Sequence, residues 1–199
     1  MSRFVTPVTL TGPRWVRVEP LSTDHIPEIE AAAEDSDNRS LWFTFAPTPE
    51  TAGQWVHRML DMQAGDDGVT FVVRRLDDGR VVGSSSMFHV DAPNRRLEIG
   101  HTWYSRSAQR TGVNSETKLV LLGHAFDTLG CVAVEFRTHF FNSTSRAAIE
   151  RLGAKLDGVL RSHQISPDGS RRDTVVYSIL DIEWPAVRSN LRYRLARYA

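Results

Sequence analysis

A glycine between basic residues, at a point where a strand pattern changes into a helix pattern, is a candidate anion site. The segment 107–115 contains Gly112, and Arg106 and Arg110 lie just before that glycine. A glycine at the start of a helix lets several main-chain N–H groups point at one external anion. A pyrophosphate fits such a cradle best. An ordinary strand-to-helix connection explains the segment at least as well, so the loop alone leaves both interpretations open.

The histidines and the one cysteine are not arranged as a metal site or a nucleophile. The seven histidines show no metal-like spacing relative to acids or cysteine, so we predict no bound metal. Cys131 is the single cysteine, which excludes an internal disulfide. It follows Gly130 and precedes an apolar run, which indicates a buried strand residue. Residues 1–10 lack the apolar core of a signal peptide, and no stretch is apolar enough to span a bilayer. These features predict a reducing, cytoplasmic setting.

The composition is that of an ordinary globular protein. Of the 199 residues, 41% are apolar and 24% are charged, which suits one domain with a sizeable core or two very small ones. The formal net charge is +0, so we expect neither a nucleic-acid nor a membrane partner. Lysine occurs only at Lys118 and Lys155. Coding bias explains this, and a preference for the bidentate phosphate contacts of arginine is the alternative.

The first half of the chain alternates between strand and helix patterns. Apolar and charged residues alternate over 15–18, as in a short strand. An acidic helix is expected over 24–35, and Thr48-Pro49-Glu50 is a typical start for a second helix that runs to about Met62. Three more strand patterns, separated by turn residues, cover 69–76, 80–89 and 96–104.

The second half begins with an amphipathic helix. Its apolar stripe consists of Leu119, Leu122, Phe126 and Leu129. Gly130 should end this helix as a left-handed cap, and a buried strand should follow over 131–138. A short helix, capped by Asn142 or Ser143, should stop at Gly153.

The last segments are a hairpin and an arginine-rich tail. Two strand patterns, 155–166 and 172–181, are joined by the turn sequence Pro167-Asp168-Gly169, and 183–199 is expected to be a helical C-terminal extension. A β-α-β unit after antiparallel strands implies a mixed sheet with at least one parallel pair. In such a sheet, ligands favour the gap where neighbouring strands diverge, beside a helix N-terminus.

Short motifs in a fixed order add a family resemblance to this pattern. They are Glu98-Ile99-Gly100, Gln109-x-x-Gly112, Asn142-x-x-Ser145, Arg151-Leu152-Gly153-Ala154 and the hairpin 157–161 with 172–178. On these motifs, residues 15–181 resemble the GNAT superfamily, specifically the RimJ/RimL-type N-acetyltransferases. The resemblance implies an α+β fold in one domain over 1–199. Its sheet would be seven-stranded and mostly antiparallel, splayed at the central strands, with helices on both faces.

The chain departs from that family pattern at two positions. Asn114 stands where the pyrophosphate loop of the family ends in a small residue, which would place the backbone further from a phosphate. Ile149 stands where many members carry a tyrosine thought to protonate the departing thiolate. Ser145 resembles a serine that some RimL-like enzymes place near the thioester sulfur, so it is our candidate acid. Its alternative role is to satisfy backbone donors in the first helical turn.

The resemblance implies acetyl-CoA as the acyl donor. Thr102 and Trp103 would line the pantetheine and offer a contact to the thioester carbonyl, and Asn142 would hydrogen-bond the pantetheine arm. The pyrophosphate would be bound mainly by main-chain donors of the loop, from Gln109, Arg110, Thr111, Gly112, Val113 and Asn114.

The acceptor amine must lose a proton, and the resemblance makes Glu98 the candidate base, acting directly or through water. The alternative is a solvated strand carboxylate that pairs with Arg95 or Arg96.

Aromatic and histidine side chains are the candidates for the acceptor pocket. Trp42, Phe43 and His101 are the predicted acceptor-binding residues, and Phe45, His139 and His163 are further candidates. Core packing explains the aromatic residues of 42–45 equally well, and a lone strand histidine is more often a surface residue than a catalyst.

Several functions remain open at this stage. The first is transfer of an acetyl group to a primary amine, such as a protein N-terminal α-amine, by direct attack in a ternary complex. The alternatives are acetylation of an antibiotic, polyamine or amino acid, a CoA-binding regulatory protein without catalysis, and an interaction module. A homodimer is an expectation from the resemblance alone, and the arginines of the tail serve either a partner contact or a solvated helix face.

Overall fold

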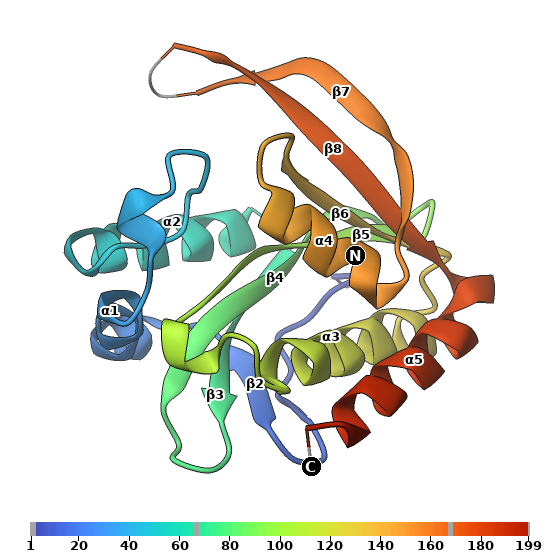
Figure 1. Cartoon of the computed structure of the whole chain (residues 1–199), viewed down its shortest axis with the longest axis horizontal. Coiled ribbons are helices and arrows are strands. Elements are labelled where there is room, and N and C mark those ends of the chain that lie inside the picture. The colour runs from blue at the N-terminus through green and yellow to red at the C-terminus, as the bar shows by residue number, and fades with distance from the viewer. Residues whose placement is uncertain (1–2, 66–67, 167–168, 199) are drawn as a thin grey trace.

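One sheet of eight strands runs through the computed structural model, which describes residues 3–65, 68–166 and 169–198 (Figure 1). The strands are neighbours in the order β1-β2-β3-β4-β5-β6-β8-β7, and every pair is antiparallel except β5 with β6. Their bounds are β1 (Leu10–Thr11), β2 (Val16–Pro20), β3 (Gly68–Arg75), β4 (Val81–Asp91), β5 (Arg96–Tyr104), β6 (Ala133–His139), β7 (Lys155–Ile165) and β8 (Arg171–Leu180).

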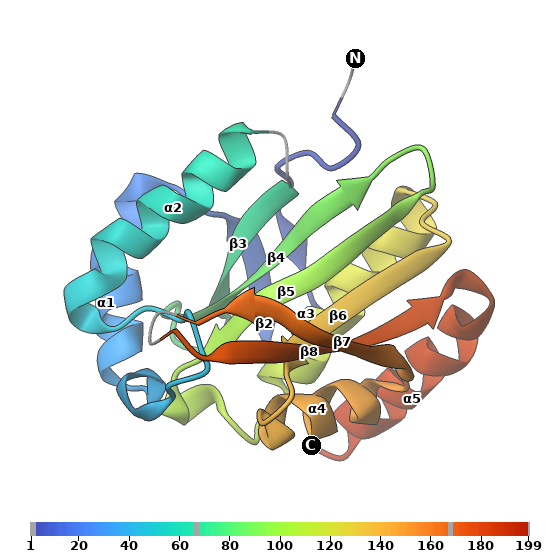
Figure 2. The same ribbon diagram turned by 90° about the horizontal axis from the view of Figure 1, so that it is seen from above.

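Helices cover both faces of the sheet (Figures 1 and 2). The first pair, α1 (Ile26–Glu34) and α2 (Ala52–Ala64), lies on one face, and α3 (Val113–Gly123), α4 (Ser143–Leu152) and α5 (Trp184–Ala196) lie on the other. The predicted α+β fold is therefore confirmed. The sheet has one strand more than expected, because the two residues of β1 pair with β2. Within the described residues, no helix is long and apolar enough to cross a membrane.

Two apolar cores hold the helices against the sheet. On the α3 side, Leu121 and Leu191 are fully buried among strand residues. On the α1 side, Ile29 and Val56 are fully buried together with Trp103. Each such side chain contributes about 1.5–3 kcal/mol relative to an exposed position, so the two cores fix the helices that flank the centre of the sheet.

The sheet divides between β5 and β6. These strands are paired only where Arg96–Glu98 lies beside Ala133–Glu135, and the remaining residues of both strands have no partner across the gap. A bulge in β5 lies opposite Ser85 of β4, and His101 there has a φ of +48°. Because a bulge bends the strand that carries it, β5 turns away from β6 beyond Glu98. The split predicted at the central strands is therefore present.

Most predicted boundaries lie within two residues of the observed ones. α3 continues as a π-helical turn over His124–Thr128, and Gly130 follows with a φ of +68°, so the left-handed residue predicted there is confirmed. Gly153, where the short helix was expected to stop, has a φ of +105°. Cys131 is buried as predicted, but it precedes β6 rather than lying in it, and burial raises the pKa of its thiol to about 11. Of the predicted turn Pro167-Asp168-Gly169, the first two residues lie outside the described part of the chain.

Candidate active site

The loop that follows β5 is fixed to the end of α1. The main-chain N–H of Arg106 donates to the carbonyl oxygen of Asp35 at 2.5 Å, and the N–H of Ser107 donates to its carboxylate at 3.0 Å. The hydrogen bonds from Ser107 lower the pKa of Asp35. The guanidinium of Arg106 pairs with Asp37, so this arginine is already engaged by a carboxylate. Arg110 is therefore the loop arginine whose charge remains for an external anion.

The backbone between the 3₁₀ turn η4 (Arg106–Ala108) and α3 forms a cluster of free donors. Arg110 has a φ of +60°, and the next residues return to right-handed conformations at the start of α3. Such a sequence of conformations brings successive N–H groups together around one point. Among the described residues, none accepts a hydrogen bond from the main-chain N–H of Arg110, Thr111, Gly112, Asn114 or Ser115. The N–H of Val113 donates weakly to Thr111 Oγ1 at 3.3 Å.

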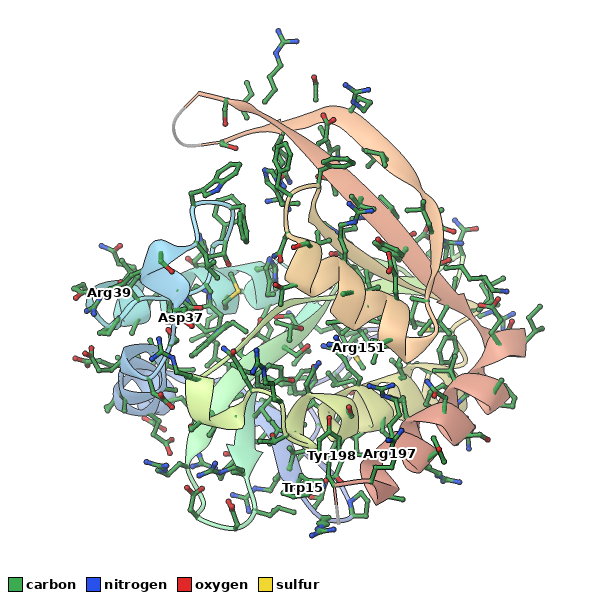
Figure 3. The ribbon with its side chains drawn as sticks, in the orientation of Figure 1. Trp15, Asp37, Arg39, Arg151, Arg197 and Tyr198 are labelled. Carbon is green, nitrogen blue, oxygen red and sulfur yellow. The ribbon has the colours of Figure 1, made fainter. Side chains whose placement is uncertain are left out.

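Gly112 is required by close packing rather than by its backbone conformation, which is right-handed with a φ of −69°. A Cβ atom at this position would lie 2.5 Å from Nε1 of Trp15, which precedes β2 and is labelled in Figure 3. A larger residue would therefore displace the indole, and the effect of any Gly112 substitution on ligand binding includes a packing effect.

A buried carboxylate ties the first residues of α3 to β2. Oε1 of Glu116 accepts the main-chain N–H groups of Arg14, Trp15 and Val16 at 3.2, 2.6 and 3.0 Å. Glu116 is 1% exposed. The donor cluster is thus built on a helix start that is held on two sides, by β2 through Glu116 and by α1 through Asp35.

Thr102 and Trp103 lie on the unpaired part of β5, as the predicted pantetheine site requires. The Thr102 side chain is exposed and its hydroxyl lies 2.8 Å from that of Ser85. The indole of Trp103 is buried against Trp55, with ring centroids 6.2 Å apart. For Trp103, only the main chain can therefore line the gap.

Glu98 lies at the point where β5 and β6 part. Its neighbours Leu97 and Ile99 pack in the α3 core, so the Glu98 side chain points to the opposite face. The carboxylate is 4% exposed, and Oε2 lies 2.9 Å from His89 Nδ1 and 3.5 Å from Arg137 Nε. The interpretation of Glu98 as a solvated carboxylate paired with Arg95 or Arg96 is wrong, because the side chain is buried and its partners are His89 and Arg137.

His101 is beside Glu98 on the same face. Its ring stacks on Phe88 with centroids 4.2 Å apart, and Nδ1 is buried without a partner among the described residues. Burial and the neighbouring charges of Arg58 and His89 lower the pKa of His101 to about 4, so the ring is neutral near pH 7.

The predicted residues of α4 have mixed roles. Asn142 caps the helix, because its Oδ1 accepts the main-chain N–H of Ser145 at 3.0 Å. Its side-chain NH₂ remains for a ligand, and the Ser145 hydroxyl is half-buried. Ile149 is 8% exposed and offers no proton.

The aromatic residues between α1 and α2 form a rim with the end of β6. The rings of Trp42 and Phe43 lie 4.9 and 5.9 Å from that of His139, and Trp42 is 60% exposed. Phe45 is 48% exposed and lies under Arg172, so core packing is the wrong explanation for Trp42 and Phe45. His163 is further out on β7, where Nδ1 lies 3.1 Å from the Thr174 hydroxyl.

Lys118 is a buried residue of the site that sequence reasoning missed. It is 5% exposed, and Nζ donates to Ser85 Oγ at 2.9 Å and to Thr102 Oγ1 at 2.8 Å. A signal was present: Lys118 lies four residues before Leu122, which extends the apolar stripe of α3 backwards onto a charged residue.

The sequence matches one protein family over most of its length. Residues 16–155 match the family described as "Acetyltransferase (GNAT) domain". The chain is 26% identical over 175 residues to the Bacillus subtilis (strain 168) protein named "Putative ribosomal N-acetyltransferase YdaF". That alignment covers 84% of this chain and 90% of the relative.

Solved structures give the same result. A GCN5-related N-acetyltransferase from Brucella melitensis is similar with a TM-score of 0.85 and 31% identity, covering 96% of this chain and 86% of that one. RimJ of Mycobacterium smegmatis, solved with CoA-disulfide, has the same fold with a TM-score of 0.77 at 19% identity, over 94% and 95% of the two chains. The chain therefore belongs to the GNAT family, as its motifs predicted, and is an acetyl-CoA-dependent N-acetyltransferase.

Proposed function

We propose that the chain moves the acetyl group of acetyl-CoA directly onto a primary amine while both substrates are bound. The observation that carries the proposal is the cluster of unpartnered N–H groups at the start of α3, beside a sheet that is open between β5 and β6. The cluster would hold the pyrophosphate through Arg110, Thr111, Gly112, Val113 and Asn114, with Gln109 at its edge.

The open edge of β5 suits an extended acyl-donor arm. On the side that faces β6, the main chain of β5 around Thr102 and Trp103 has no strand partner, although Trp103 pairs with Ser84 of β4 on the other side. A main-chain N–H on this free side can hydrogen-bond a pantetheine as a further strand would, or polarise the thioester carbonyl. The amide of Asn142 and the hydroxyl of Ser145 lie at the start of α4, which places them as candidates for contacts with the same arm.

The acceptor amine would enter on the α1 and α2 face. Glu98 is the proposed base there, since its carboxylate is buried at the apex of the split and contacts the half-exposed His89 as a route for the proton. His101, Trp42 and Phe43 would line the acceptor side. The B. subtilis relative is named as a ribosomal acetyltransferase, which supports a protein N-terminal α-amine as the acceptor class.

Calorimetry with acetyl-CoA, followed by a thiol-release screen, tests the proposal. The screen compares peptides that differ in their first residue with polyamines, aminoglycosides and amino acids. We expect saturable acetyl-CoA binding and CoA release with the peptides. Binding without release over the whole panel would leave only a CoA-binding role, and absence of binding would remove the donor site. Release with small amines alone would replace the peptide acceptor.

A further inference from the structure

Lys118 is a buried amine that the fold places against the open edge of β5. Its Nζ donates to two hydroxyl groups, and among the described residues no carboxylate lies within ion-pair distance. A buried charge without a counter-ion is costly, and lysines are almost never fully buried unless paired. The position therefore calls for a reason other than stability.

The two hydroxyl groups connect the buried Lys118 amine to the exposed residue Thr102 by hydrogen bonds. An ammonium can only donate, so both Ser85 Oγ and Thr102 Oγ1 accept from Lys118. The two oxygens are 2.8 Å apart, and Ser85 is fully buried while Thr102 is exposed. When Ser85 donates to Thr102, the hydroxyl proton of Thr102 is left for a further acceptor. The carbonyl oxygen of Gly100 accepts it in a long contact of 3.4 Å, which a stronger acceptor in the gap between β5 and β6 can replace.

We propose that Lys118, acting through the Thr102 hydroxyl, provides the proton that CoA takes up as it leaves. This inference rests on the proposed function. As the thioester C–S bond breaks, its electron pair stays on sulfur, and the sulfur takes the proton of the Thr102 hydroxyl. The Thr102 oxygen takes a proton from the Lys118 ammonium, which becomes a neutral amine. Solvent then protonates Lys118 again after CoA has left.

The surroundings of Lys118 support this role. Burial lowers the pKa of Lys118 to about 7, so its proton can be transferred near neutral pH. Tyr104, on the same face of β5, is half-buried, and burial of its hydroxyl raises the pKa, so it keeps its proton. Glu116, on the same helix, is occupied by the N–H groups at the start of β2.

On the opposite face of β4 and β5 lie His89, Glu98 and His101. Ile149 leaves α4 without the tyrosine that many family members use.

The lysine content of the chain allows a direct measurement. Lys118 and Lys155 are the two lysines, so protein labelled with ¹³C at lysine Cε gives two side-chain signals. Lys155 is 76% exposed, pairs with Glu183 and serves as the internal control. We titrate the protein alone, with CoA, and with desulfo-CoA, which lacks the thiol.

The Lys118 titration should move to higher pH with CoA than with desulfo-CoA, because the thiolate is a nearby anion that shares its proton. Lys155 should titrate identically in all three samples. Equal Lys118 titrations with CoA and desulfo-CoA would overturn the inference and leave the proposed function intact. Failure of CoA to bind by calorimetry would overturn both.

Variants test the transfer with an acceptor found in the screen. Thr102→Val keeps the shape but removes the hydroxyl, and kcat should fall on the order of 100-fold with little change in the acetyl-CoA Kd. Thr102→Ser should restore most of the rate. Lys118→Met should lower kcat similarly and remove the decline of kcat above neutral pH. A structural role would instead move Kd and Tm together and leave the shape of the pH–rate profile unchanged, and that result would overturn the inference.

Discussion

Two buried ionisable side chains approach the split of the sheet from opposite faces. Glu98 points to the α1 and α2 face, where His89 and Arg137 contact its carboxylate. Lys118 reaches from α3 to the Thr102 hydroxyl on the other face. The base and the acid that we propose are thus separated by one strand, which suits a reaction that removes a proton from an amine and delivers one to a thiolate.

Glu98→Gln should reduce turnover on the order of 100-fold, most strongly at low pH, while the acetyl-CoA Kd stays nearly constant. The loss is largest at low pH because, without the base, the rate depends on the small fraction of acceptor that is already neutral. A pH–rate profile measured by thiol release checks this. Glu135→Gln is the matched control, since Glu135 is beside Glu98 on β6 but pairs with Arg96 and Arg137. An unchanged profile for Glu98→Gln would remove it from the mechanism.

Arg110→Ala should weaken acetyl-CoA binding by about tenfold, the amount expected for one charge-assisted contact to a phosphate. Alanine tolerates the left-handed backbone no worse than arginine, so the change isolates the charge. Arg192→Ala, at an exposed position of α5, should bind as the wild type does. Calorimetry at low and high salt measures both variants, and equal affinities would place the phosphate elsewhere.

Lys118 should make stability depend on pH. Burial lowers its pKa to about 7 from the ordinary 10.5, so between these values the unfolded chain binds a proton that the folded chain does not. The free energy of unfolding should therefore rise with pH in this window, by up to about 1.4 kcal/mol per pH unit, and the full penalty of burying the charge remains below it. Urea unfolding of the wild type and Lys118→Met checks this. If the free energies of unfolding of the wild type and Lys118→Met changed with pH in parallel, the prediction would be contradicted. Lys155→Met is the control at an exposed lysine.

At the scale of elements, Glu116 couples β2 to the start of α3. One carboxylate oxygen accepts three N–H groups from consecutive residues, which no main-chain strand partner could do at that point. The hydrogen bonds therefore fix both the first turn of α3 and the position of Trp15 against Gly112.

Glu116→Ala should destabilise the chain by about 3 kcal/mol or more, because buried donors lose a charged acceptor. Glu116→Gln keeps one acceptor oxygen in place and should cost less. Thermal unfolding measures both, and a loss of about 3 kcal/mol corresponds to a Tm decrease of roughly 6–12 °C. If Glu116→Ala left the Tm unchanged, water would have to satisfy these N–H donors.

Local patterns predicted most elements, and long-range pairing supplied the rest. Hydrophobic periodicity located the strands within two residues, because each carries its own apolar alternation. The helix expected to run to Gly130 is α3, which ends at Gly123, followed by a π-helical turn over His124–Thr128. β1 was missed because two residues carry no pattern. The environment of Glu98 was misjudged because its burial depends on strand β6, whose pairing is not local. The partners of Lys118 come from β4 and β5, and no spacing within α3 predicts them.

At the scale of the whole molecule, the sheet has two halves, and the half made of β6, β8 and β7 is joined to the other by few strand pairs. Three residue pairs link β5 to β6, and α3, α4 and α5 pack across the junction on one face (Figure 2). Among the described residues, no helix of the second half of the chain packs on the other face of the junction, which is the face from which we propose that the acceptor approaches Glu98.

Acetyl-CoA should slow amide hydrogen exchange in 99–104 and 109–115 and leave the outer half of the β7–β8 hairpin unchanged. The first two segments gain hydrogen-bond partners under the proposed binding mode, and the hairpin does not. Exchange mass spectrometry on free and bound protein measures this. Uniform protection over the chain, or protection confined to the hairpin, would contradict the binding mode.

The short pairing between β5 and β6, which has three residue pairs, also limits how stable this enzyme can become. Each additional main-chain pair between β5 and β6 would add hydrogen bonds and stabilise the fold, but it would occupy the main-chain groups that we propose as the site of the acyl donor. A variant selected only for heat resistance could therefore gain thermal stability by extending the pairing between β5 and β6, and it would lose turnover for the same reason.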